Sequence, residues 1–224
     1  MTSFQRARTE EQREIRHQSI LDTTASMLDE MPVSAVSLNE LSRRTGLAKS
    51  NVMRYFESRE AILLELLDRA RTQWTDALPA RLSAAIDREA PASERGEQFA
   101  TAVTESLTDR RVMCDLLSAQ AGVLEHNVSP EVAARYKKAA LANVDTLAAL
   151  ARMHLPELGD RAPELAAFTI MTIGAVWTHA RPSQAMLTAY EADPSLAALR
   201  MDFAATLRQM LTTLTAGTLV RASC

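Results

Sequence analysis

An all-α fold is predicted by three observations. Apolar residues recur at steps of three and four along most of the chain, the spacing of amphipathic helices. Gly and Pro are few, at 6 and 8 of 224 residues, while 47 % of the residues are apolar and supply a buried core. No segment shows the convincing alternation of apolar and polar residues that is typical of a strand. We expect a small three-helix domain over residues 1–57 and a larger helical bundle over residues 58–224.

The first domain is expected to contain three helices joined by short turns. The first helix spans residues 10–30. Ser37 then begins a short helix, because Ser37 and Glu40 have the S-x-x-E spacing of a capping box. Gly46 suits the left-handed position that ends this helix, and a third helix follows over residues 48–55. Two short helices joined by a few residues that include Gly form a helix-turn-helix unit.

The bundle is expected to begin with a fourth helix that Ser58 caps and that ends before Pro79. Ser93 and Ser129 are further predicted N-caps, because a Ser side chain satisfies free backbone N–H groups at a helix start. The remaining helices are predicted at residues 80–89, 93–109, 111–125, 130–154, 163–180 and 195–216.

The cysteines and the hydropathy pattern predict a cytoplasmic protein. Cys114 and Cys224 are the only cysteines and make no disulfide framework, which is typical of a reducing compartment. The first sixteen residues lack the apolar core of a secretory signal. The longest near-apolar run, residues 166–177, is too short to cross a bilayer. We expect no membrane partner.

One short window has an unusual charge distribution. Residues 41–56 contain four cations and no carboxylate, in a chain whose formal net charge is −3. A helix that enters the major groove of DNA needs cations beside the phosphates and polar side chains at the base edges. On charge alone, a solvated cationic face of an ordinary helical hairpin is as well supported as a DNA-binding surface. The residues predicted to contact DNA are Ser37, Arg43, Arg44, Thr45, Lys49, Ser50, Asn51, Arg54, Tyr55 and Arg59.

The N-terminal segment is a second candidate contact. Arg6, Arg8 and Arg13 would suit a flexible arm that reaches into a groove. The alternative is a solvated tail, which the neighbouring Glu10 and Glu11 favour.

Residues 15–67 resemble the DNA-binding domain of the TetR family of bacterial transcription regulators. The resemblance rests on Ile20-Leu21, the S-x-x-E-L helix, T-G-L, the pair Tyr55-Phe56, and S-R-E-A at 58–61. It implies a homodimer that binds a double-stranded DNA operator and lies in the bacterial cytoplasm, at the nucleoid when bound. It also implies that the larger domain dimerises and binds a small-molecule effector, with no cofactor.

The resemblance assigns roles to individual residues. Lys49 resembles the family's phosphate-contacting lysine, Arg54 and Tyr55 its backbone- or base-contacting positions, and Arg59 its basic residue at the fourth helix. Two positions depart from the family pattern. Met53 replaces a frequent Tyr that contacts phosphate, and Ala48 replaces a frequent Ser. Both departures leave the operator preference open.

Two helices of the bundle are expected to form the dimer interface. The helix at 163–180 is apolar nearly all round, and the helix at 195–216 has an apolar stripe beside small residues. Two such helices from each subunit would make a four-helix interface with two-fold symmetry, although the same stripes could serve a monomer core. The interface residues predicted are Phe168, Ile173, Trp177, Leu199, Phe203, Leu207, Leu211 and Leu214.

An effector pocket is expected within the bundle. Candidate lining residues are large apolar side chains with a few polar ones, and the alternative for most is plain core. Cys114 is expected to be an inert buried thiol. The candidates are Trp74, Phe99, Met113, Cys114, Leu117, Gln120, Tyr136, Phe168, Met171, Trp177 and His179.

Two other functions were considered. An enzyme with a di-iron site needs two E-x-x-H motifs, but the chain has one, at Glu14 and His17, and no phosphate-binding or nucleophile motif. A helical interaction protein would not need the cationic window. We therefore predict a regulator, a repressor that an effector releases from its operator, without catalytic or metal-binding residues.

Overall fold

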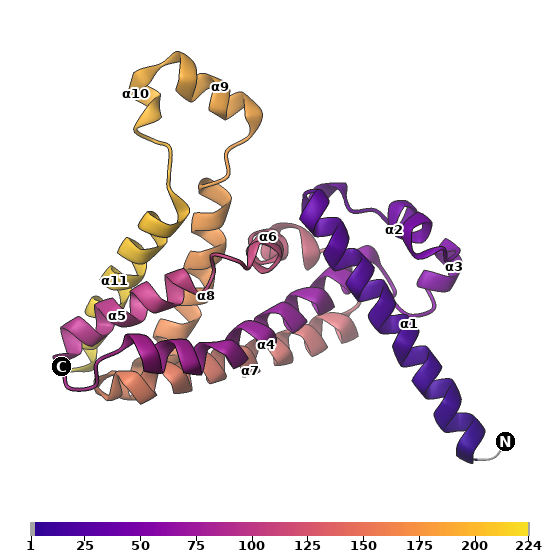
Figure 1. Ribbon diagram of the computed structural model, residues 1–224, viewed down its shortest axis with the longest axis horizontal. Helices are drawn as coiled ribbons and strands as arrows, with labels where there is room; N and C mark the ends of the chain where they lie inside the picture. Colours follow the sequence, from indigo (N-terminus) through magenta and orange to yellow (C-terminus); the bar gives the residue numbers. More distant parts are fainter. Residues whose placement is uncertain (1–2, 224) are drawn as a thin grey trace.

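The computed structural model describes residues 3–223, with side chains from residue 10 onward, and every regular element in this part of the chain is a helix. This confirms the predicted all-α fold. Figure 1 shows a small N-terminal group of helices at one end of a larger bundle. We call residues 3–57 the head and residues 58–223 the rear domain. Arg6, Arg8 and Cys224 lie outside the residues whose side chains are described.

The head consists of α1 (Ser3–Glu30), the short 3-10 helix η1 (Val33–Ala35), α2 (Leu38–Thr45) and α3 (Lys49–Val52). The predicted signals around α2 are confirmed. The Ser37 hydroxyl accepts a hydrogen bond from the Glu40 backbone N–H at 3.2 Å, and Gly46 has a left-handed φ of 66°. The first helix begins seven residues earlier than expected, and the third is only one turn long.

The long helix α4 (Arg59–Ala85) follows the head and is the first helix of the rear domain. Ser58 caps it, as predicted, but the predicted end before Pro79 is wrong because the helix runs through this proline. Leu78 and Leu82, exposed by 1 % or less, continue the buried stripe on both sides of Pro79. Burying a leucine contributes about 1.5–3 kcal/mol. Two leucines therefore offset the roughly 3 kcal/mol that an interior proline costs.

The rear domain packs its helices around α4. Figure 1 shows α7 lying along α4, with α5, α8 and α11 gathered at the end away from the head. The predicted caps at Ser129 and Ser93 have different outcomes, because Ser129 caps α7 while Pro91 stands at the N-cap of α5. The elements are α5 (Ala92–Glu105), α6 (Arg111–Ala119), the π-helix η2 (Gln120–Leu124), α7 (Pro130–His154), the 3-10 helix η3 (Pro156–Arg161), α8 (Ala162–His179), α9 (Gln184–Ala192), α10 (Pro194–Ala197) and α11 (Phe203–Ala222).

The predicted helix at 195–216 is divided in two, which corrects that prediction. Residues 194–197 form the single turn α10, and α11 begins only at Phe203. Asp193 and Asp202 each accept a backbone N–H with their side chains, at 2.9 and 2.7 Å, and so start a new helix at each place. The helix α9 was not predicted. Figure 1 shows α9 and α10 projecting beyond the ends of α8 and α11.

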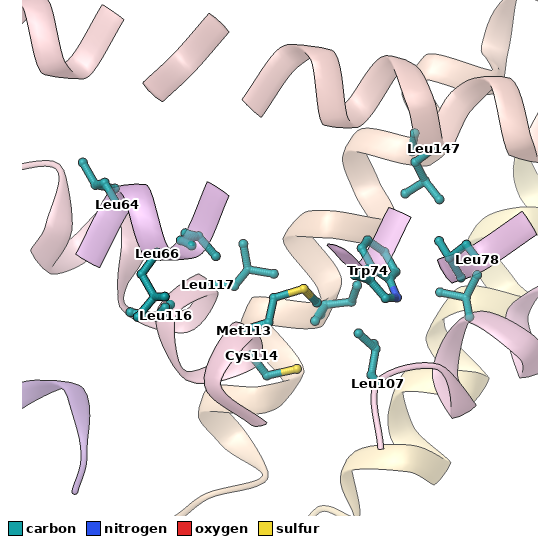
Figure 2. Close-up of a cluster of buried hydrophobic side chains, with 14 of the residues drawn as sticks. Leu64, Leu66, Trp74, Leu78, Leu107, Met113, Cys114, Leu116, Leu117 and Leu147 are labelled. Atoms are coloured by element: carbon teal, nitrogen blue, oxygen red, sulfur yellow. The ribbon is translucent and has the colours of Figure 1, made fainter. Parts of the chain in front are cut away.

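The centre of the rear domain is a continuous apolar core. Figure 2 shows Trp74 of α4 beside Leu78, Leu107 and Leu147, with the Met113 and Cys114 side chains nearby. The Trp74 indole N–H donates to the Ser106 hydroxyl at 2.7 Å, so this fully buried ring keeps its polar atom paired. Over residues 3–223, none of the helices combines the length and hydropathy needed to span a bilayer.

Candidate nucleic-acid interface

The predicted DNA surface lies on the outer side of α2 and α3. Lys49, Ser50, Asn51 and Arg54 are exposed, whereas the inner residue Val52 is fully buried. This division follows from the helical turn, because a four-residue helix that buries Val52 must present its polar neighbours outward. No intramolecular hydrogen bond or ion pair within residues 10–223 engages the side chains of these four polar residues. They are available to a ligand.

Two of the predicted arginines are held by carboxylates. Glu40 accepts hydrogen bonds from Arg43 Nη2 at 2.6 Å and from Arg44 Nε at 2.8 Å. Arg44 also donates through Nη2 to Glu30 at 2.8 Å. The hydrogen bonds from Arg43 and Arg44 lower the pKa of Glu40 to about 2. The local positive charge is therefore smaller than residues 41–56 suggest, since Glu40 lies one position outside that window.

Arg43 and Arg44 differ in exposure. The Arg43 side chain is 71 % exposed and stays at the surface although Glu40 binds it. The Arg44 side chain is 22 % exposed and connects α2 to the end of α1 through Glu30. The spacing of Glu40 to Arg43 and Arg44, three and four residues, is the sequence signal that indicates these pairs.

Three other predicted residues make contacts within the chain. Ser37 caps α2, and the Thr45 hydroxyl donates to the Leu41 carbonyl at 2.8 Å. Arg59 donates through Nη2 to the Val33 carbonyl at 3.0 Å and so connects the start of α4 to η1. Through these contacts, the three side chains stabilise the folded structure of the head.

Tyr55 is half-buried and lines a cleft behind α3. The cleft has a volume of about 620 Å³, and its walls come from α1, the end of the head, α4 and α7. The structure thus places Tyr55 apart from the exposed residues of α3.

The head is attached to the rear domain by polar contacts that the sequence did not predict. Glu57 accepts a hydrogen bond from the backbone N–H of Ser129 at 2.6 Å, which lowers the pKa of Glu57. Because Ser129 is also the N-cap of α7, the carboxylate lies at the positive end of that helix. Arg69 of α4 donates to Asp22 of α1 at 2.7 Å. These contacts couple the position of the head to α4 and α7.

The predicted effector residues are mostly core. Trp74, Phe99, Met113, Cys114 and Leu117 are exposed by 7 % or less. Burial raises the pKa of Cys114 to about 12, which agrees with the inert thiol expected there. Of these five, Met113 borders a small cavity of about 230 Å³ between α1, α4 and α6.

The other predicted effector residues lie nearer the surface, except Tyr136, which is buried. Gln120 donates to Glu125 at 2.7 Å, and the Trp177 indole N–H donates to Asp115 at 2.8 Å. Phe168 is half-buried, and His179 and Met171 are exposed. Tyr136 lines the cleft behind α3.

The predicted interface residues fall into three groups. Ile173, Leu207 and Leu211 are exposed by 1 % or less and pack within the chain. Trp177 and Phe203 are half-buried against each other, with ring centroids 4.7 Å apart. The others are the half-buried Phe168 and Leu214, and Leu199, which is 62 % exposed beyond α10.

In the E-x-x-H motif of Glu14 and His17, the histidine contacts a carboxylate and an aromatic ring of the chain. His17 Nε2 is 3.1 Å from Glu65 Oε1, and the imidazole stacks on Phe56 with centroids 4.6 Å apart. Among the described residues, no group of three or more His, Cys, Asp or Glu side chains could hold a metal ion.

Comparisons with known proteins agree with this arrangement. Residues 20–66 match the family description "Bacterial regulatory proteins, tetR family", and residues 68–222 match "Tetracyclin repressor-like, C-terminal domain". The HTH-type transcriptional regulator EthR from Mycobacterium tuberculosis is 37 % identical over 63 residues, which cover 28 % of this chain and 29 % of EthR. The match thus spans less than a third of this curated relative.

Solved structures share the fold over most of the chain. The regulator FadR from Bacillus subtilis, solved with stearoyl-CoA, is 15 % identical and gives a TM-score of 0.53 over 89 % of this chain and 98 % of FadR. A regulator from Mesorhizobium loti is also 15 % identical, with a TM-score of 0.53 over 93 % and 96 %. The C-terminal family description covers more than half of the chain, so the chain belongs to the TetR family of DNA-binding transcription regulators.

Proposed function

We propose that the chain is a homodimeric repressor that binds a palindromic operator and leaves it when a small-molecule effector binds. The observation that carries this proposal is the exposed polar surface of α3 and the turn after it, where Lys49 and Arg54 are exposed and no carboxylate lies between them. In a TetR-type head this surface is the part that enters the major groove.

The proposed contacts divide into two kinds. Lys49 and Arg54 bind phosphates, because both are exposed and neither is paired with a carboxylate among the described residues. Ser50 and Asn51 reach base edges, since their side chains can both donate and accept hydrogen bonds. Arg43 adds a further phosphate contact, whereas Arg44 holds α2 against α1.

A dimer interface is proposed on the outer sides of α8 and α11. Met171 of α8 is 60 % exposed and Met210 of α11 is 43 % exposed, and these two helices pack against each other. Apolar side chains that a single chain leaves in water are stabilised when a second copy covers them. To enter successive major grooves, the two heads of such a dimer would have to lie about 34–36 Å apart, one turn of DNA.

An effector would act by changing that separation. A ligand shifts an equilibrium only by the difference between its affinities for the two arrangements. The contacts of the head with α4 and α7, through Arg69 and Glu57, give the rear domain a direct way to move the head.

Selection of bound fragments from genomic DNA tests this function. The purified chain should retain a small set of fragments that share a palindrome, and their affinity should fall steeply as salt increases because phosphate contacts release counterions. An affinity for DNA that does not change with salt, or retention of fragments without a common sequence, would contradict the proposal. The genes beside the selected fragments would indicate the effector.

A further inference from the structure

The cleft behind α3 has the size and composition of a binding site. Its volume of about 620 Å³ lies in the range of small-molecule pockets. Its walls come from both parts of the molecule, since Tyr55 belongs to the head while Tyr136 belongs to α7. Ala61, Leu64 and Ala139 supply an apolar surface beside these rings. Such a surface suits a flat apolar body.

The inner wall of the cleft is negatively charged. Glu65 and Asp68, three residues apart on α4, are half-buried and both line the cleft. Among the described residues, no Arg or Lys pairs with Glu65, which meets only the imidazole of His17. Asp68 accepts a hydrogen bond from Asn143 at 3.1 Å, and its nearest cation is the buried Arg71, with 3.9 Å between Nη2 and Oδ1. With Arg71 counted, the two carboxylates and the one buried guanidinium leave a formal charge of −1 at this wall.

The side chains at the rim of the cleft add no net charge to that of the inner wall. Glu10 and Glu14 line the rim together with Arg13 and Arg135, and all four side chains are exposed. Two carboxylates and two guanidinium groups cancel in formal charge. Solvent screens exposed charges, whereas half-buried charges act at higher strength. The inner carboxylates consequently decide the sign of the charge that the cleft favours.

Two buried atoms beside these carboxylates can accept further hydrogen bonds. In the neutral imidazole, the contact of His17 Nε2 with Glu65 assigns the proton to Nε2 and leaves Nδ1 as an acceptor. His17 Nδ1 is buried and has no partner within the chain. Tyr136 is 5 % exposed, and its buried hydroxyl makes no close hydrogen bond within the chain, although the Arg71 guanidinium lies over the ring at 5.1 Å from its centroid. Buried polar atoms are normally hydrogen-bonded, so His17 Nδ1 points to a ligand that donates, whereas the Tyr136 hydroxyl can either accept or donate.

We propose that this cleft binds a small organic cation, an ammonium group on a flat apolar body. The ammonium N–H groups donate to the carboxylates of Glu65 and Asp68, with the His17 and Tyr136 acceptors beside them. The apolar body lies against Leu64 and the Tyr55 ring. This ligand is the effector of the proposed repressor, and to that extent the inference rests on the proposed function. Because the cleft joins the head to α7, an occupied cleft fixes the head at one angle.

Calorimetry on the full chain without DNA tests the chemical class. Tryptamine is the cationic probe, and tryptophol and indole-3-acetate are its neutral and anionic counterparts with the same ring. Tryptamine should bind at least about tenfold more tightly than tryptophol, as expected for a charge-assisted hydrogen bond, and indole-3-acetate should not bind. Equal or tighter binding of the anion would overturn the proposal. So would the failure of tryptamine, phenethylamine and benzamidine all to bind.

Variants test the location of the site. Glu65→Gln keeps an acceptor for His17 but removes the charge, and should weaken tryptamine binding about tenfold. Tyr136→Phe should weaken it severalfold while the melting temperature stays the same or rises, because the change removes an unpartnered buried hydroxyl. Glu97→Gln, on the exposed side of α5, is the matched control and should bind like the parent. Tryptamine binding that neither cleft variant alters would place the site elsewhere and refute the proposal.

Operator binding distinguishes this inference from the proposed function. If tryptamine binds in the cleft but no operator is selected, the site stands and the repressor assignment fails. If an operator is bound but no amine binds, the repressor assignment stands and the cleft proposal fails. If both bind, tryptamine should change the operator affinity of the parent and not that of Glu65→Gln.

Discussion

Individual side chains around α2 illustrate why a local charge count is an incomplete guide. Arg43, Arg44 and Arg59 are equally cationic in the sequence, but they have different roles in the structure. Arg59 binds a backbone carbonyl, Arg44 bridges two carboxylates, and Arg43 remains mostly exposed. Lys49 and Arg54 are free of such contacts in the described chain. The contribution of a cationic residue to DNA binding therefore depends on whether a carboxylate or carbonyl of the chain already binds it.

Removal of the free cations should therefore weaken DNA binding selectively. Lys49→Ala and Arg54→Ala should each weaken operator affinity and reduce the slope of log affinity against log salt by about one unit. Fluorescence anisotropy at several salt concentrations measures both quantities. Lys138→Ala removes an exposed cation from α7 and is the control. If Lys138→Ala has the same effect as Lys49→Ala and Arg54→Ala, the DNA surface does not lie on α3 and the turn after it.

His154 gives a prediction about pH. Both imidazole nitrogens are buried without partners, and burial, with the nearby charge of Arg88, lowers the pKa of His154 below 6.5. The unfolded chain then binds this proton more readily than the folded chain. His154 therefore reduces stability as pH falls through 6.5 towards the lowered folded value, while above 6.5 its effect is absent.

Urea denaturation at pH 7.5 and pH 5.5 measures this effect. His154→Leu should lose less stability than the parent between these two values, because it has no imidazole to protonate. His126→Leu, at an exposed position, should lose as much as the parent. An equal loss in the parent and His154→Leu would show that His154 is charged in the folded chain.

Among the elements, those with strong local signals were predicted best. Ser37, Gly46, Ser58 and Ser129 end or begin helices where expected, because each acts through a backbone group only a few residues away. The prediction at Pro79 failed because burial along α4 outweighs the lost hydrogen bond, and burial depends on distant parts of the chain.

Gly46 offers a test of one such signal. Its φ of 66° is left-handed, and a Cβ there would meet no atom within 4 Å, so a substitution adds only backbone strain. Gly46→Ala should reduce stability by about 1 kcal/mol. Gly122→Ala also meets nothing within 4 Å, but its φ is not positive, and it should be neutral or slightly stabilising. Chemical denaturation compares them, and equal stability of the two variants would refute the assigned role of Gly46.

At the scale of the whole molecule, the central question is how the rear domain controls the head. The long helix α4 begins directly after the head and runs through the rear domain, and α7 begins beside Glu57 at the end of the head. Figure 1 shows α8 and α11 at the opposite end of the bundle. A change at a dimer interface there would reach the heads through α4 and α7.

The proposed dimer interface is open to a direct test. Met171→Asp and Met210→Asp should each convert the dimer to monomers, because a carboxylate in an apolar interface is costly to bury. Analytical ultracentrifugation measures the mass, and operator affinity should fall with dimerisation. Leu141→Asp, at a position 61 % exposed on α7, is the control. A dimer that survives both methionine changes, or dissociates with the control, would place the interface on other helices.

The sequence by itself determined the helical fold and the helix-turn-helix unit, because these depend on periodicity and on caps within a few residues, and its motifs indicated the family by resemblance. Tertiary structure decided which arginines remain free, which apolar residues belong to the core of one chain, and that Tyr55 and Tyr136 share a cleft. Those outcomes depend on contacts between residues far apart in the chain, such as Arg44 with Glu30. Spacing along one helix carries no information about such contacts, since it does not place one helix against another.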